Sequence, residues 1–233
     1  MEKMIYAVWK HETESHADFR EKLLGGVSRR LLALGVHKLL ISVVDEDVAP
    51  ADPLRIIATR PSAEGIISMW VDTANNRKPL EEVIEGAVAR IVGYLVTESM
   101  PVVNKKYGVL DGERVPGMNS VVFLQKPPRL SYEYWLETWL GNHTQIAIET
   151  QSTFGYKQNV IVRPLTYAAP PYHAIVEENF PEEAMTDNQA FYNAKGDEEK
   201  CSKHEQAMIE SCARFIDFEK LDRILMSEYV VRS

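Results

Sequence analysis

The order of predicted secondary structure occurs twice in this chain, and this repetition restricts the fold more than any other sequence feature. Hydrophobic spacing in residues 1–112 predicts strand, helix, strand, strand, helix and strand, and residues 117–233 repeat that order. A short polar turn cluster at 111–117 lies at the join. We therefore expect two domains of similar architecture.

The alignment of the two halves supports a common origin. In the first half the predicted strands cover 5–9, 37–44 and 91–96, with two short candidates at 56–58 and 66–71 for the third strand, and the helices cover 16–34 and 80–89. In the second half the strands cover 120–124, 156–162, 173–178 and 224–231, and the helices 132–146, 182–194 and 198–216. A shift of 116 residues places Val27 at the position of His143. A diverged tandem duplication explains this match, and two unrelated halves of similar architecture are the alternative.

The predicted fold class is α+β. Each half has the element order of a ferredoxin-like unit, which is a four-stranded antiparallel sheet with helices on one face. The strand segments 39–44 and 121–124 are apolar on both faces, so both faces of each sheet need cover. Packing the two sheets against each other gives an intramolecular version of a dimeric α+β barrel with helices outside. A second chain is then not needed for the core, and a homo-oligomer would form through the helices.

Composition and missing motifs exclude several functions. The net charge of −8 argues against a nucleic-acid partner, which needs a basic surface. No apolar run reaches the roughly 18 residues that a membrane span needs, and the N-terminus does not read as a targeting segment. Cys201 and Cys212 lack zinc-ligand spacing and are expected to be reduced thiols of a cytoplasmic protein. No nucleotide-binding motif, no C-x-x-C pair and no clustered set of histidine ligands occurs, so we expect no cofactor and no metal.

His143 is the most informative candidate for a functional residue. It follows Trp139 by four residues and Trp135 by eight, so all three lie near one apolar helix face. A histidine there is either a hydrogen-bonded core residue or an acid–base group of a pocket, because imidazole titrates near neutrality. Gly141 just before it weakens the helix and could leave space for a ligand.

Residues after this helix complete the candidate site. Tyr156 and Gln158 share one face of a predicted strand under period-two alternation, and the Tyr156 phenol could hold a substrate oxygen or cap the sheet edge. Phe154 precedes that strand and is expected to pack nearby. The acid-rich segment 177–199 has no calcium-loop pattern and is predicted to be a solvated surface.

These stretches together resemble the EthD-type family of dimeric α+β barrels. The resemblance is carried by Gly117–Leu124, by Trp135-x-x-x-Trp139-x-x-x-His143 and by residues 150–159. It implies a small hydrophobic pocket between helices and sheet, with His143, Tyr156 and Gln158 at family positions. The first half departs from the pattern at Val27, so its own pocket is expected to be inactive scaffold.

The resemblance favours an enzyme, and other functions stay open. The enzyme would be an oxidoreductase or lyase that acts without a cofactor on an apolar or aromatic compound by oxygenation, dehydration or cyclisation. His143 and Tyr156 would be its catalytic residues. The substrate would contact Trp135, Trp139, Phe154 and Gln158. The alternative is a non-catalytic binding or stress-related module, and a more distant one is a haem protein with His143 as axial ligand.

Overall fold

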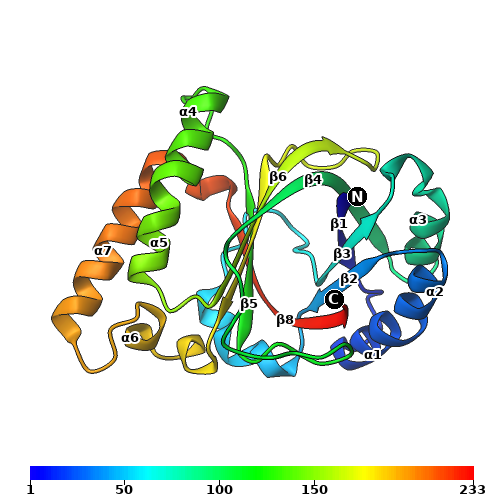
Figure 1. Ribbon diagram of the computed structural model, residues 1–233, viewed down its shortest axis with the longest axis horizontal. Helices are drawn as coiled ribbons and strands as arrows, with labels where there is room; N and C mark the ends of the chain where they lie inside the picture. Colours follow the sequence, from blue (N-terminus) through cyan, green and yellow to red (C-terminus); the bar gives the residue numbers. More distant parts are fainter.

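Eight antiparallel strands close into one barrel in the computed structural model, which describes residues 1–233 (Figure 1). The strands are β1 (Glu2–Trp9), β2 (Lys38–Val43), β3 (Gly65–Val71), β4 (Arg90–Val102), β5 (Met118–Leu124), β6 (Gly155–Pro164), β7 (Ala174–Phe180) and β8 (Asp222–Arg232). Around the barrel they follow the order β1-β3-β2-β8-β5-β7-β6-β4. Each half therefore supplies four adjacent strands, and the predicted α+β barrel is confirmed.

The two sheets do not merely face each other, because hydrogen bonds also join them at their edges. Strand β2 of the first half is hydrogen-bonded to β8 of the second, and β4 is hydrogen-bonded to β6. The two sheets are thus joined along both edges. This arrangement leaves no free sheet edge, which would otherwise need protection from pairing with another chain.

Helices cover two opposite sides of the barrel (Figure 1). The first side carries α1 (His16–Lys22), the π-helical turn η1 (Leu23–Val27), α2 (Ser28–Ala33) and α3 (Lys78–Glu85). The other side carries α4 (Tyr132–Leu136), the π-helical turn η4 (Glu137–His143), α5 (Thr144–Thr150), α6 (Asn188–Phe191) and α7 (Glu198–Phe215). Short 3-10 turns are η2 (Glu46–Leu54), η3 (Ala74–Asn76), η5 (Glu182–Met185) and η6 (Phe218–Lys220). No helix combines the length and the apolar character needed to cross a membrane.

The helical segments that follow β1 and β5 begin in the same way and share one irregularity. Ser15 caps the first by accepting a hydrogen bond from the Asp18 backbone N–H at 3.1 Å, and Ser131 caps the second. Each helix then contains a π-helical turn, a feature that occurs often at functional sites. These turns end at Val27 and His143, which the sequence alignment places opposite each other.

Two predicted elements differ in the structure, one being absent and the other divided. Residues 56–58 do not form a strand, and Ile56 makes only an isolated bridge to Arg223. The preceding residues form a 3-10 turn that contains Pro50 and Pro53, whose fixed backbone angles and missing N–H groups disfavour a ladder. The predicted helix 182–194 is split into η5 and α6, because Asp187 has an extended backbone and caps α6 instead of continuing the helix.

Some of the side chains inside the barrel are charged, and no charged residue was predicted there. Lys3 is paired with Glu98 and lies 3.3 Å from Glu177, and Lys157 is paired with Glu228. Glu177 is only 1% exposed, so its assignment to a solvated surface was wrong. Strand alternation turns Glu177 inward, and two lysines compensate its charge there.

Candidate functional site

A cavity of about 210 Å³ lies on the outer side of the barrel in the second half, between β5–β8 and the helices η4 and α7. Its walls are mostly apolar, with polar side chains among them. The lining side chains that are most exposed are apolar as well: Ile56, Ile209 and Phe218. Cavities with apolar walls and few polar groups are the usual form of a small-molecule site.

The sheet places four polar side chains on this cavity through strand register. Tyr156 on β6 is opposite Glu178 on β7, which in turn is opposite Ser120 on β5. Arg223 on β8 is opposite the residue two positions beyond Ser120 and therefore points to the same face. These four residues come from four neighbouring strands, and all of them line the cavity.

His143 reaches the cavity from the last position of the π-helical turn η4. Its Nδ1 lies 2.9 Å from the Ser211 hydroxyl of α7, and its ring packs against Phe215. Burial, and secondarily the positive charge of Arg214, lower the pKa of His143 to about 4. The imidazole is therefore neutral near pH 7. It can accept a hydrogen bond or a proton there, but it has no extra proton to supply.

Tyr156 and Trp139 form the inner wall of the cavity. The Tyr156 hydroxyl accepts a hydrogen bond from Trp139 Nε1 at 3.4 Å. Burial, with the negative charge of Glu178 as a second cause, raises the pKa of Tyr156 well above its ordinary value. The phenol therefore remains protonated and can donate a hydrogen bond to a ligand oxygen. Trp135 is fully buried behind this wall, with its Nε1 donating to the Phe215 carbonyl at 3.1 Å.

Gln158 and Phe154 lie outside the cavity lining. Gln158 donates to the Thr144 hydroxyl at 2.7 Å and accepts from the Ser99 hydroxyl at 3.1 Å, so its amide already has protein partners. Phe154 packs edge to face against Tyr107. Of the residues predicted for the site, the structure brings three together on the cavity, namely Trp139, His143 and Tyr156.

Glu178 and Arg223 are the cavity residues that sequence reasoning missed. Burial raises the pKa of Glu178 to about 7, and the positive charge of Arg223 only partly offsets this effect. The prediction that Glu178 belongs to a solvated acidic surface is also wrong, because this side chain is partly buried at the outer cavity. Glu177 and Glu178 both lie within the segment 173–178 that was itself predicted to be a strand. Alternation along this strand would have placed one acid on each face.

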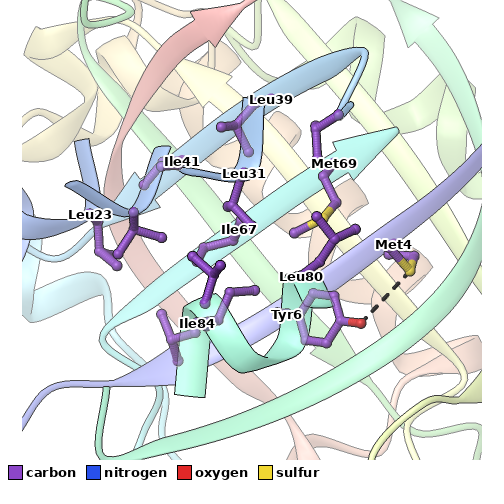
Figure 2. Packing of buried hydrophobic residues seen from close by; sticks show 14 of the residues in the cluster. Met4, Tyr6, Leu23, Leu31, Leu39, Ile41, Ile67, Met69, Leu80 and Ile84 are labelled. Carbon is purple, nitrogen blue, oxygen red and sulfur yellow. Dashed lines mark hydrogen bonds between the residues drawn. The ribbon is translucent and has the colours of Figure 1, made fainter. Parts of the chain in front are cut away.

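The corresponding space in the first half is filled. Figure 2 shows the side chains of β1–β3 and of the helices α2 and α3 packed together there. The Tyr6 hydroxyl, a polar group of this region, already has a protein partner because it donates to Glu81 at 2.9 Å. A larger polar cleft of about 960 Å³, lined by Trp9 and Arg90 among others, lies elsewhere in this half and does not include Val27.

Comparison with known proteins identifies the fold class. No family model matches the sequence, and no curated protein matches it either. Among solved structures, an anthrone oxidase-like protein is similar with a TM-score of 0.55 and 9% identity, over 100% of this chain and 94% of that chain. A candidate monooxygenase from Lactobacillus acidophilus is similar with a TM-score of 0.50 and 10% identity, over 99% and 96% of the two chains.

A candidate monooxygenase from Fusobacterium nucleatum is a third similar structure, with a TM-score of 0.50 and 11% identity over 99% of this chain and 92% of that chain. The chain shares the fold of these three proteins along nearly its whole length. Identities this low show the fold alone. The EthD-type membership expected from the sequence stays a prediction.

Proposed function

We propose that this protein is a small-molecule enzyme similar to EthD-type proteins, which moves protons on an apolar or aromatic compound without a bound cofactor. The observation that supports it is the mostly apolar cavity into which groups with oppositely shifted pKa values project. The pKa of His143 is lowered to about 4 and that of Glu178 is raised to about 7. Such separation of pKa values is typical of acid–base sites.

The residues of this chain suit proton abstraction next to a carbonyl group. The apolar wall with Trp139 holds the carbon skeleton, and the protonated Tyr156 donates a hydrogen bond to the carbonyl oxygen as negative charge develops on it. The neutral His143 accepts a hydrogen bond or the proton. The resulting enolate can expel hydroxide from the next carbon, and the hydroxide takes the proton from His143 and leaves as water. Alternatively it can transfer one electron to molecular oxygen, the oxidant of this route, and combine with the superoxide formed to give a peroxide. The names of the solved neighbours favour the second outcome.

The second candidate is a binding protein without turnover, favoured by the small volume of the cavity. At about 210 Å³ it is below the roughly 300 Å³ at which sites for drug-sized ligands begin. A haem macrocycle would therefore need side chains to move before His143 could act as axial ligand. His143 is also only 7% exposed, as a structural histidine would be.

We also propose that residues 1–112 and 117–233 are repeats of one ferredoxin-like unit that arose by tandem duplication. Their strands follow the same internal order, and both π-helical turns end at aligned positions. The first half then acts as scaffold and the second carries the site. Association through the helices and a cytoplasmic location remain predictions.

Solvent deuterium exchange tests the enzyme proposal, because it detects proton abstraction whichever reaction follows. The protein is incubated with small aromatic ketones, 1-indanone and 2-indanone, in D₂O, and loss of the α-proton signal is followed by NMR. We expect accelerated exchange with wild type. We expect none above background with Val176→Phe, which fills the cavity and leaves its polar groups in place. Binding of the ketones without exchange would favour the second candidate.

A further inference from the structure

Two charged side chains on the cavity have hydrogen-bonding capacity that the protein does not use. The Glu178 carboxylate has no hydrogen-bond or ion-pair partner, although it is partly buried. Arg223 donates from Nε to the Ser120 hydroxyl at 3.1 Å, and its two terminal nitrogens donate to no protein group. Its guanidinium lies over the Phe191 ring, 5.2 Å from the centroid. A cation and an anion thus line one cavity without pairing with each other.

This lack of partners contrasts with the rest of the protein. Inside the barrel the buried charges have protein partners: Lys3 is paired with Glu98 and Glu177, and Lys157 with Glu228. Asp222 accepts hydrogen bonds from the Tyr172 hydroxyl and from two backbone N–H groups. Leaving a charge desolvated and unpaired is costly, so such groups normally find a protein partner. A guanidinium offers a planar set of donors that matches an oxyanion. The free donors of Arg223 and the free acceptors of Glu178 therefore point to a ligand that contacts both.

We propose that the cavity binds a small ring compound through an acidic oxygen, a phenolate or enolate held by Arg223, with Glu178 holding the proton that the compound gives up. This inference rests on the proposed function and specifies the substrate class of that site. The balance is simple: one proton moves from the ligand to the carboxylate, and the electron pair stays on the ligand oxygen. Ser120 acts as a positioning residue, because its hydroxyl accepts from Nε and leaves the two terminal nitrogens free to donate to a ligand.

The other titratable side chains around Glu178 have pKa values far from 7. Burial raises the pKa of Tyr192 and of Cys212 to about 12 and raises that of Tyr156 well above its usual range. Burial lowers the pKa of His143 to about 4. Arg223 stays cationic, although burial lowers its pKa. Glu178 is therefore the cavity group whose pKa lies closest to 7, so its equilibrium protonation changes when a ligand anion binds, even where His143 carries the proton during exchange.

The test compares 4-nitrophenol, studied at pH 8 where it is largely ionised, with nitrobenzene, which has the same ring but no acidic oxygen. Calorimetry gives both affinities, and repeating the titration in buffers of different ionisation heat gives proton uptake. We expect wild type to bind the phenolate at least about tenfold more tightly than nitrobenzene. We also expect uptake of a proton, up to about one per ligand, because the bound anion raises the pKa of Glu178.

The variants separate the roles of the two charged residues. Arg223→Met should weaken phenolate binding by about 10- to 100-fold and leave nitrobenzene binding unchanged, and Arg223→Lys should have an intermediate effect. Glu178→Gln should abolish proton uptake. Arg29→Met, which makes the same charge change on an exposed helix of the first half, is the matched control and should change nothing. Thermal melts check that each variant is folded.

Several results would overturn the proposal. These are equal affinity of wild type for phenolate and nitrobenzene, an unchanged phenolate affinity in Arg223→Met, or proton uptake that persists in Glu178→Gln. Tighter binding of benzoate than of 4-nitrophenolate would replace the phenolate assignment with a carboxylate. If nitrobenzene binds and Val176→Phe abolishes that binding, failure of the phenolate test leaves the proposed function standing. If no probe binds and no ketone exchanges, both fall.

Discussion

The outer sheet faces of the two halves have equivalent registers but opposite contents. In the first half, the cross-strand set Leu39, Met69 and Met4 is apolar and packed beneath the helices. In the second half the equivalent set is Tyr156, Glu178 and Ser120, and a cavity lies above it. The helices above both faces have the same π-helical turn. On the strands, polar residues replace methionine and leucine, and the 18-residue α7 covers this face where the eight-residue α3 covers the other.

The position of Arg223 extends this comparison by one strand. Its register equivalent in the first half is Gly93, which is paired with Tyr6 on β1. A Cβ placed at Gly93 would lie 2.4 Å from the Tyr6 ring, so that ring occupies the space where a side chain would begin. In the second half Val122 takes the place of Tyr6, and the arginine has room. Exchanges at a few outer strand positions thus contribute to the difference between a filled core and a cavity.

The largest expected effect is the difference in ketone exchange rate between substitutions at the aligned positions His143 and Val27. If His143 takes part in proton transfer, His143→Ala should lower the ketone exchange rate by about 10²–10⁴. Val27→Ala should leave that rate unchanged. If His143 is instead structural, its replacement leaves the Ser211 hydroxyl unpaired and costs roughly 1–3 kcal/mol of stability. Exchange rates and thermal melts of both variants decide, and a strongly lowered melt with an unchanged rate would end the catalytic role.

Met69 on β3 and Glu178 on β7 hold equivalent positions in the two sheets. Giving each position the other's residue, in separate variants, should change the free energy of unfolding in opposite directions. Met69→Glu places an unpaired charge in a fully packed face and should cost about 3–5 kcal/mol or prevent folding. Glu178→Met removes a charge that lacks a partner and should stabilise the fold by about 1–4 kcal/mol, at the expense of ligand binding. Urea denaturation measures both. A destabilised Glu178→Met would mean that the carboxylate serves the fold.

Much of the fold could be predicted from the sequence, because repeated hydrophobic periodicity determines which segments are strands and helices. The site was only partly predictable. Trp139 and His143 share a helix face by spacing alone, and Tyr156 opens a recognisable strand. The partners of Glu177 are far away in the chain, with Lys3 separated from it by 174 residues. Adjacent glutamates therefore looked alike in sequence, although one is paired inside the barrel and the other faces the cavity.

The pH dependence of stability should distinguish these adjacent glutamates. The folded pKa of Glu178 is raised from 4.5 to about 7, so the folded protein binds more protons than the unfolded chain between these values. Its contribution to stability therefore falls as the pH rises from about 4.5 to 7, by at most about 3 kcal/mol. Although burial opposes it, Lys157 and Lys3 lower the pKa of Glu177. Its contribution is present above pH 4.5 and is lost in more acidic solution.

Urea titrations of Glu178→Gln and Glu177→Gln across the pH range measure this contrast. Glu178→Gln should be more stable than wild type at pH 8, with the gain vanishing toward pH 4.5. Glu177→Gln should be less stable than wild type at pH 8, because Lys3 and Lys157 lose a partner. Parallel profiles for the two variants would show that the adjacent carboxyl groups have similar environments, contrary to the structure.

The smallest expected effect concerns glycines at aligned positions of the two π-helical turns. A Cβ added at Gly25 or Gly141 meets no atom within 4 Å, so alanine fits at both. Each substitution should stabilise the protein by roughly 0.5–1 kcal/mol, because alanine loses less backbone freedom in a helix. If bending of η4 admits the ligand, Gly141→Ala alone should slow ketone exchange. An equal slowing in Gly25→Ala would show that the first half is more than scaffold, since no cavity lies beneath its turn.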